Sequence, residues 1–159
     1  MVAIVTCSCG LASIDPWSSR RLFCLEIIML NFHEERMSDA MVKYHIEGLE
    51  RPAVIHRFTS PDFGPHHDHP WPFYSFVISG GYVEEVFDLE DGDTHLVRRS
   101  VGQSFYIPET HIHRIVELPN GICETIILPF ETKQKSGFWE FRDDGTYHRF
   151  WDGDWEKVK

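Results

Sequence analysis

The chain has 159 residues, a formal net charge of -10 and a hydrophobic content of 42%. Its length fits one domain with a sizeable core, and its acidic balance excludes a general attraction to nucleic acid. No apolar run reaches the roughly 20 residues that a membrane-spanning helix needs. Three of the four cysteines lie within the first 24 residues, so the body of the chain has no disulfide framework. We therefore expect a cytoplasmic protein with no nucleic-acid or membrane partner.

Residues 1–36 differ in character from the rest of the chain. Ser18 and Ser19 can cap a helix over residues 20–36, which contain two apolar runs. Met37 then opens a Met-Ser-Asp-Ala sequence that is typical of a protein start. We expect residues 1–36 to be an N-terminal extension, helical in its second half, and residues 37–159 to be the folded domain. The extension either stands apart from the domain or packs its helix on the outside.

From Met41 onward the pattern becomes that of short β-strands. The expected strands are rich in β-branched and aromatic residues and are separated by turns such as Gly80-Gly81 and Asp91-Gly92. They cover residues 41–46, 53–59, 73–79, 82–89, 95–99, 103–107, 113–118 and 123–128. About eight short strands at regular spacing, with no helix between them, predict an all-β sandwich or barrel.

The tail after residue 136 is rich in aromatic residues. Its Asp144-Gly145 turn can join two short aromatic strands. We expect these aromatic side chains to cover an open edge or end of the barrel. The alternative is an aromatic lid over a binding pocket.

Two stretches of histidines have the spacing of a metal site. His67 and His69 are two residues apart, so on a strand they point to the same side, whereas His66 has the opposite parity and should face outward. Downstream, His111 and His113 have the same spacing. Neutral imidazole is a good ligand for several transition metals. Two such pairs on separate strands of one small barrel can converge on a metal ion.

In their order and strand pattern, these stretches resemble the two motifs of the cupin superfamily. The matching residues of the first motif are Gly64, His67, His69 and either Gly80 or Gly81. Those of the second are Gly102, Pro108 and His113, with Thr110 in place of a usual Gly. The resemblance covers about residues 41–130, and the His-Asp-His-Pro-Trp run is similar to that of small bacterial and phage cupins. It implies a double-stranded β-helix, or jelly-roll barrel, with its site between the two sheets.

The first cupin motif also implies a Glu ligand, which falls here at Phe73 or Tyr74, and neither is a carboxylate. The resemblance therefore carries over three metal ligands, which are His67, His69 and His113. Three protein ligands with an open position are a catalytic arrangement for zinc. Cupins with three histidines and no Glu resemble the Fe(II) thiol dioxygenases. The implied cofactor is a divalent metal ion, either Fe(II), Zn, Ni or Mn.

Several other side chains are candidates for the site. Tyr74 can place a phenol near the ion, although ordinary strand packing explains it as well. One of Glu84 and Glu85 must face inward by alternation, as a carboxylate ligand or a general base; we name Glu84. Arg114 offers charge to an anionic substrate or forms a surface salt bridge. His111 is a fourth ligand or a donor behind the ligands, unless it lies exposed in the turn before its strand.

Taken together, the resemblance implies a small metal-dependent enzyme acting on a small polar or anionic molecule inside the barrel. The reaction classes that we expect are dioxygenation, isomerisation and hydrolysis. The alternative is a non-catalytic cupin that binds a small ligand, such as a sugar or an anion, without metal. Because cupins often form dimers through barrel edges, we also expect a homodimer.

Overall fold

The structure is a computed structural model that describes residues 2–7, 25–90 and 92–159. All regular secondary structure in these ranges is β-strand, which confirms the expected all-β class. In chain order the strands are β1 (Val2–Cys7), β2 (Leu25–Arg36), β3 (Met41–Glu47), β4 (Ala53–Phe58), β5 (His66–His67), β6 (Phe73–Ser79), β7 (Tyr82–Phe87), β8 (Thr94–Arg99), β9 (Ser104–Ile107), β10 (Ile112–Glu117), β11 (Cys123–Pro129), β12 (Gly137–Arg142), β13 (Gly145–Phe150) and β14 (Glu156–Lys157). Within the described ranges there is no helix that could cross a membrane.

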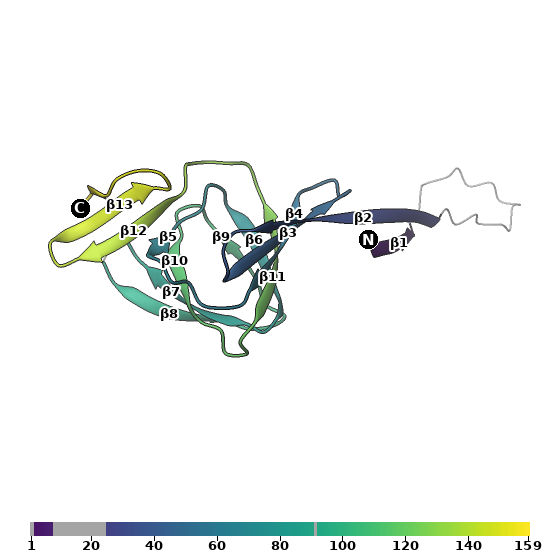
Figure 1. Cartoon of the computed structure of the whole chain (residues 1–159), viewed down its shortest axis with the longest axis horizontal. Coiled ribbons are helices and arrows are strands. Elements are labelled where there is room, and N and C mark those ends of the chain that lie inside the picture. The colour runs from purple at the N-terminus through teal and green to yellow at the C-terminus, as the bar shows by residue number, and fades with distance from the viewer. Residues whose placement is uncertain (1, 8–24, 91) are drawn as a thin grey trace, which may run out of the picture.

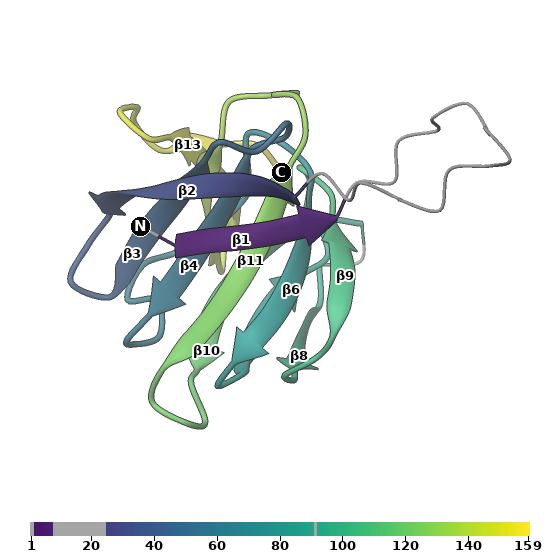
Figure 2. The same ribbon diagram turned by 90° about the vertical axis from the view of Figure 1, so that its right-hand side faces the viewer.

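The strands form two antiparallel sheets of seven strands each. The first sheet has the order β1-β2-β3-β4-β11-β6-β9, and the second has the order β14-β13-β12-β5-β10-β7-β8. Strands that are distant in the chain are therefore neighbours, since β11 lies between β4 and β6, and β10 lies between β5 and β7. Figure 2 shows β3, β4, β11, β6 and β9 side by side. This arrangement is the jelly-roll barrel that the sequence predicts.

The core lies between the sheets and is built by alternation along the strands. In β6 the buried Phe73, Ser75 and Val77 alternate with the exposed Tyr74 and Phe76. Two clusters of buried apolar side chains lie inside the barrel. The first contains Val54, Phe73, Ile107 and Ile127, and the second contains Val77, Tyr82, Ile115 and Cys123. Full burial of such a side chain contributes roughly 1.5–3 kcal/mol. The second cluster joins residues of both sheets, whereas the first lies on the inner face of the first sheet.

The Gly80-Gly81 turn joins β6 of the first sheet to β7 of the second. The expected β6–β7 hairpin is therefore wrong, because β6 pairs with β11 and β9 whereas β7 pairs with β10 and β8. Both glycines have positive φ angles, 74° and 79°, a backbone conformation that glycine adopts without steric cost. A Cβ atom at Gly80 would also collide with the carbonyl group of Ile122. The turn therefore requires glycine, and it determines which side chains of β7 face inward.

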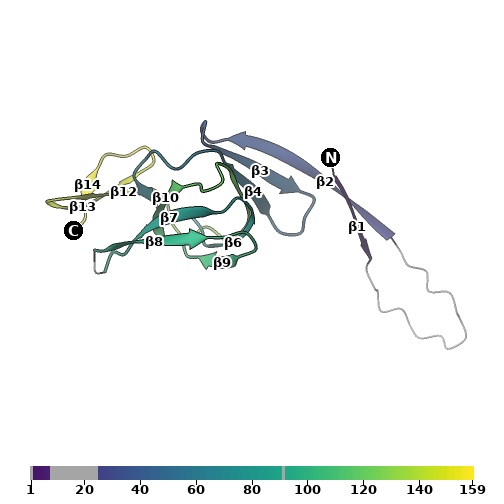
Figure 3. The same ribbon diagram turned by 90° about the horizontal axis from the view of Figure 1, so that it is seen from below.

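The predicted helix over residues 20–36 is wrong for residues 25–36, which form strand β2; residues 20–24 lie outside the described residues. Residues 25–30 pair with β1 and residues 31–36 pair with β3. Each half of β2 thus gains inter-strand hydrogen bonds with one neighbour, and Ile27, Ile28 and Phe32 favour a strand. Pairing with neighbouring strands thus outweighs the helical pattern. Figures 1 and 3 show β1 and the first part of β2 projecting away from the barrel.

The aromatic tail forms the hairpin β12–β13, as expected from its Asp144-Gly145 turn. Strand β12 also pairs with β5, so that Phe138 lies opposite His67. On the outer side, the Phe141 ring stacks on Phe87 with a centroid distance of 3.3 Å. The tail therefore covers the edge of β5 and extends the second sheet, in agreement with the edge-covering interpretation.

Candidate metal centre

Strand β5 is only two residues long, and it brings the two histidine stretches together. His67 pairs directly with His113 on β10, and paired residues of neighbouring strands point to the same side of a sheet. His69 lies in the loop that follows β5, and its backbone N–H donates a hydrogen bond to the carbonyl oxygen of Glu109. One potential ligand atom of each of these three histidines lies within 4.8 Å of the other two. The structure thus assembles the three histidines that the sequence singles out.

The spacing of their ring nitrogens fits a metal ion. The Nε2 atoms of His69 and His113 are 3.0 Å apart, and the His67 ring centroid is 4.9 Å from that of His113 and 5.4 Å from that of His69. Two nitrogens that each lie about 2.0–2.1 Å from one ion are roughly 3.0–3.4 Å apart at ordinary coordination angles. The nitrogens of His69 and His113 are thus already spaced as two ligands of one ion, and a ring nitrogen of His67 lies within 4.8 Å of both.

Glu84 holds the other side of the His113 ring. Its side chain is fully buried, and its Oε2 accepts a hydrogen bond from Nδ1 of His113 at 2.5 Å. Its Oε1 accepts a hydrogen bond from Nε of Arg99 at 2.6 Å. With the proton on Nδ1, Nε2 of His113 keeps its lone pair for an ion, as in the carboxylate–histidine–metal arrangement of many metalloproteins.

A second group that could hold an ion contains Glu84, His111 and His113. His111 Nε2 lies 3.3 Å from Oε2 of Glu84. The 2.5 Å between Glu84 and His113 is the length of a charge-assisted hydrogen bond, and it is too short for two ligands of one ion. The spacing of this group therefore fits orientation of the His113 ring better than metal binding, and the Nε2 side of the ring is the one with room for an ion.

The electrostatics of the site keep the ligands in their metal-binding form. Burial, together with the charge of His113, lowers the pKa of His67 to about 3 and the pKa of His69 well below its ordinary value. Both rings are therefore neutral near pH 7, as a ligand must be. Burial alone would raise the pKa of Glu84, but hydrogen bonds from His111 and His113 and the charge of Arg99 hold it below its ordinary value.

At the position of the missing Glu ligand, the structure has an inward Phe73 and an outward Tyr74. The Phe73 ring packs edge-on against His69 with a centroid distance of 4.9 Å. Tyr74 is 45% exposed on the outer face of β6, where it contacts Tyr106 and Phe130. Alternation along β6 separates the two residues, so the position of Tyr74 does not fit a phenol beside the ion.

Alternation also separates the two acidic residues of β7. Glu84 faces inward, whereas Oε2 of Glu85 lies on the outer face, 2.8 Å from Nη2 of Arg114 and 3.0 Å from Nε2 of His66. Arg114 therefore forms a salt bridge with Glu85, which was the alternative to a role in binding an anionic substrate. His66 faces outward, as expected. It is nevertheless buried, because Phe141 on β12 covers it.

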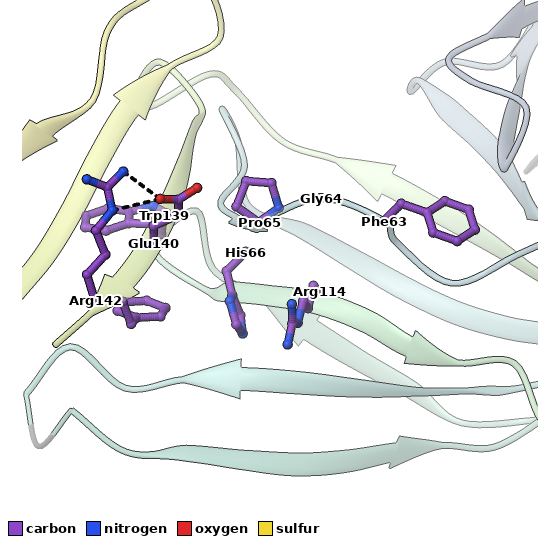
Figure 4. A pocket seen from close by; sticks show the side chains of 9 residues that line it. Phe63, Gly64, Pro65, His66, Arg114, Trp139, Glu140 and Arg142 are labelled. Atoms are coloured by element: carbon purple, nitrogen blue, oxygen red, sulfur yellow. Dashed lines mark hydrogen bonds and ion pairs between the residues drawn. The ribbon is translucent and has the colours of Figure 1, made fainter.

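His66 and Arg114 line a hollow of about 580 Å³ beside β5 and β10 (Figure 4). Its lining residues are Phe63, Gly64, Pro65, His66, Arg114, Trp139, Glu140, Phe141 and Arg142. Both arginines are paired with carboxylates, Arg114 with Glu85 and Arg142 with Glu140.

Three residues that hold the histidines in place were not predicted from the sequence. The buried Asp68 accepts hydrogen bonds from the backbone N–H of Gly137 at 2.7 Å and from Nε1 of Trp139 at 2.9 Å, which ties β12 to the histidine loop. Gln134 Nε2 donates to the carbonyl oxygens of His69 and Glu109. Arg99 fixes Glu84. Only Asp68, placed between two histidines, had a local signal in the sequence.

Solved structures of known enzymes share this fold. A variant of oxalate decarboxylase from B. subtilis matches with a TM-score of 0.52 and 17% identity, over 75% of this chain and 30% of that chain. Hydroxypropylphosphonic acid epoxidase from S. wedmorenis matches with a TM-score of 0.50 and 14% identity, over 62% of this chain and 55% of that chain. The chain therefore spans 30% and 55% of the lengths of these two proteins. No family model and no curated protein sequence matches.

Proposed function

This chain has the cupin fold, and from that premise we propose that it is a small metal-dependent enzyme acting on a small polar or anionic molecule inside the barrel. The observation that carries the proposal is the convergence of His67, His69 and His113, with Nδ1 of His113 bound to the buried Glu84. Such a hydrogen bond directs Nε2 to a metal ion. Fold alone does not define a reaction, so the argument rests on this cluster.

The donor set bears on the identity of the metal. Three imidazoles suit Fe(II), Zn and Ni, whereas Mn prefers oxygen ligands, so Mn is the weakest of the four expected ions here. A divalent ion in this site supplies Lewis acidity or, as Fe(II), redox chemistry. Because all three ligands are neutral, we expect the open positions to attract an anionic group of the substrate. Dioxygenation, isomerisation and hydrolysis are the reaction classes that we propose.

Residues around the three histidines orient the metal ligands and exclude water from the site. Phe73 and Trp71 flank the His69 ring, with centroid distances of 4.9 and 6.1 Å, and they make one wall of the site apolar. Arg99 and Glu84 hold His113 in a single orientation. An apolar wall excludes water, and His113 is held in one orientation. Both features strengthen electrostatic interactions with a bound anion.

A non-catalytic cupin that binds a small ligand is the second candidate. The observation that favours it is Phe73, an apolar side chain in the place of the Glu ligand. Turnover separates the two candidates: the protein loaded with Fe(II) or Zn is incubated with a panel of small carboxylic and thiol acids, and oxygen uptake and products are measured. An enzyme gives many equivalents of product and loses activity in His113→Ala, whereas a binder gives none.

We also propose a cytoplasmic homodimer. The four cysteines make no disulfide framework, as expected of a reducing compartment. The outer face of the first sheet exposes apolar side chains where a sheet facing water normally carries polar ones. These are Tyr74, Phe76, Ile78, Tyr106, Leu128 and Phe130. Light scattering of the wild-type chain and of Phe76→Glu tests the dimer, which the charge should disrupt.

A further inference from the structure

Three polar side chains on the inner wall of the first sheet have no partner for at least one polar atom. Ser75 on β6 is 2% exposed and Thr125 on β11 is 3% exposed, and neither hydroxyl makes a hydrogen bond in the part of the chain that the structure describes. His56 on β4 has a buried Nε2 without a hydrogen-bond partner. A buried nitrogen without a partner, as in His56, is uncommon and lowers stability, and the two hydroxyls are available to an incoming polar group. We call His56, Ser75 and Thr125 the inner polar wall.

The three side chains lie on neighbouring strands and face the same side. Thr125 pairs with His56 on β4, and Ile127, two residues further along β11, pairs with Ser75 on β6. Residues two apart on a strand share a face, and the buried Ile127 belongs to the core. The inner polar wall is therefore a patch inside the barrel.

A series of contacts connects this wall to the metal centre. Ser75 pairs with Phe105 on β9, and the guanidinium group of Arg99 lies 3.9 Å above the Phe105 ring. Arg99 in turn binds Glu84, which binds His113. On β6, Phe73 precedes Ser75 by two residues on the same face and touches His69. The wall thus lies across the barrel interior from the proposed ion.

We propose that the inner polar wall recognises the end of the substrate that does not bind the metal. This inference rests on the proposed function and names its substrate class, which is a short, oxygen-rich acid with a hydroxyl or carbonyl group several atoms away from its anionic end. A hydroxyl can donate and accept, so Ser75 and Thr125 suit either group. An aliphatic tail would leave the three polar side chains unpaired, and a site built to bind a hydroxyl discriminates against the analogue that lacks it.

The test uses two acids that differ by one group, 4-hydroxybutyrate and pentanoate, which carries a methyl group in place of the terminal hydroxyl. Each acid is titrated into the Co(II)-loaded full chain, and the visible absorption of the ion reports binding. We expect 4-hydroxybutyrate to bind roughly 5–10-fold more tightly, as one or two hydrogen bonds allow. The preference should disappear in Thr125→Val and Ser75→Ala, return in Thr125→Ser, and persist in Ser104→Ala, whose hydroxyl lies on the outer face.

Equal affinities of the two acids for the wild-type chain would overturn the inference, as would a preference that survives both Thr125→Val and Ser75→Ala. If 4-hydroxybutyrate does not change the spectrum of the wild-type chain, the inference is overturned too. In all three cases the metal site stands if His67→Ala abolishes the Co(II) spectrum. If the wild-type chain binds no Co(II), or binds it equally well without His67, the proposed function fails together with the inference.

Discussion

The two sides of the His113 ring contain similar residues and serve different purposes. On the Nε2 side are His67 and His69, with a nitrogen–nitrogen separation of 3.0 Å between His69 and His113. On the Nδ1 side are His111 and Glu84, with an oxygen–nitrogen separation of 2.5 Å. The first spacing suits a metal ion and the second suits a shared proton. A cluster of histidines and carboxylates therefore indicates a metal site only when its distances leave room for the ion.

Removal of a ligand from the metal side should have the largest effect. We expect His69→Ala to lower the affinity for Zn or Co(II) by roughly 100–1000-fold, since one ligand of three is lost. His111→Ala, on the supporting side, should change the affinity by less than about 10-fold. Competition with a chromophoric chelator measures both, and His95→Ala on exposed β8 is the control. Equal losses for His69 and His111 would refute the assignment of the two sides.

Glu84→Gln tests the supporting side directly. The substitution removes the charge that pairs with Arg99 and weakens the acceptor for His113, so metal affinity should fall roughly 10–100-fold. Breaking a buried charge pair should also lower the free energy of unfolding by about 3 kcal/mol. Metal titration and urea unfolding measure these effects. Glu85→Gln, one residue along on the outer face, is the matched control, and an equal effect there would contradict the inward role of Glu84.

A comparison of Phe73→Glu with Tyr74→Glu tests which residue of β6 faces the proposed ion. Only Phe73 faces His69, so only Phe73→Glu should supply the missing anionic ligand and raise metal affinity by about 10-fold. The metal-free variant should be less stable, because an unpaired carboxylate is buried. Tyr74→Glu, on the outer face, should leave affinity unchanged. A gain for Tyr74→Glu alone would mean that β6 has the opposite register.

The sequence pointed directly to the three histidines that lie together in the structure, and less directly to the groups behind the His113 ring. The i, i+2 spacing of His67 and His69 is local and needs only a strand to place both rings together. The choice between Glu84 and Glu85, by contrast, depends on the register that the Gly80-Gly81 turn imposes. Arg99 reaches Glu84 only through β7–β8 pairing. Such contacts between strands leave no pattern in a single sequence.

The same reason explains the error at residues 25–36. Their apolar residues fit a helix as well as a strand, and only the neighbouring strands β1 and β3 decide between the two. The jelly roll was predictable because turn residues recur at regular spacing and alternation is local. Partner choice between distant strands, such as β11 with β4 and β6, was available only through the family resemblance.

Removal of residues 1–36 should have the smallest effect on the metal side, because β1 and β2 lie at one edge of the first sheet, whereas β5 and β10, which carry His67 and His113, belong to the second sheet. We expect a chain that starts at Met37 to fold cooperatively and to bind metal within about 3-fold of the full chain. Loss of the β2–β3 pairing and of the buried Leu30 should lower Tm by roughly 3–8 °C. Calorimetry and metal titration check this. Loss of cooperative melting would show that residues 1–36 belong to the domain.

The most direct test of the central claim is anomalous diffraction from crystals of the protein loaded with Zn. We predict one peak about 2.0–2.2 Å from Nε2 of His69 and His113 and from one ring nitrogen of His67, with Glu84 still hydrogen bonded to Nδ1 of His113. A peak between Glu84 and His111, or no peak at the three histidines, would contradict the account.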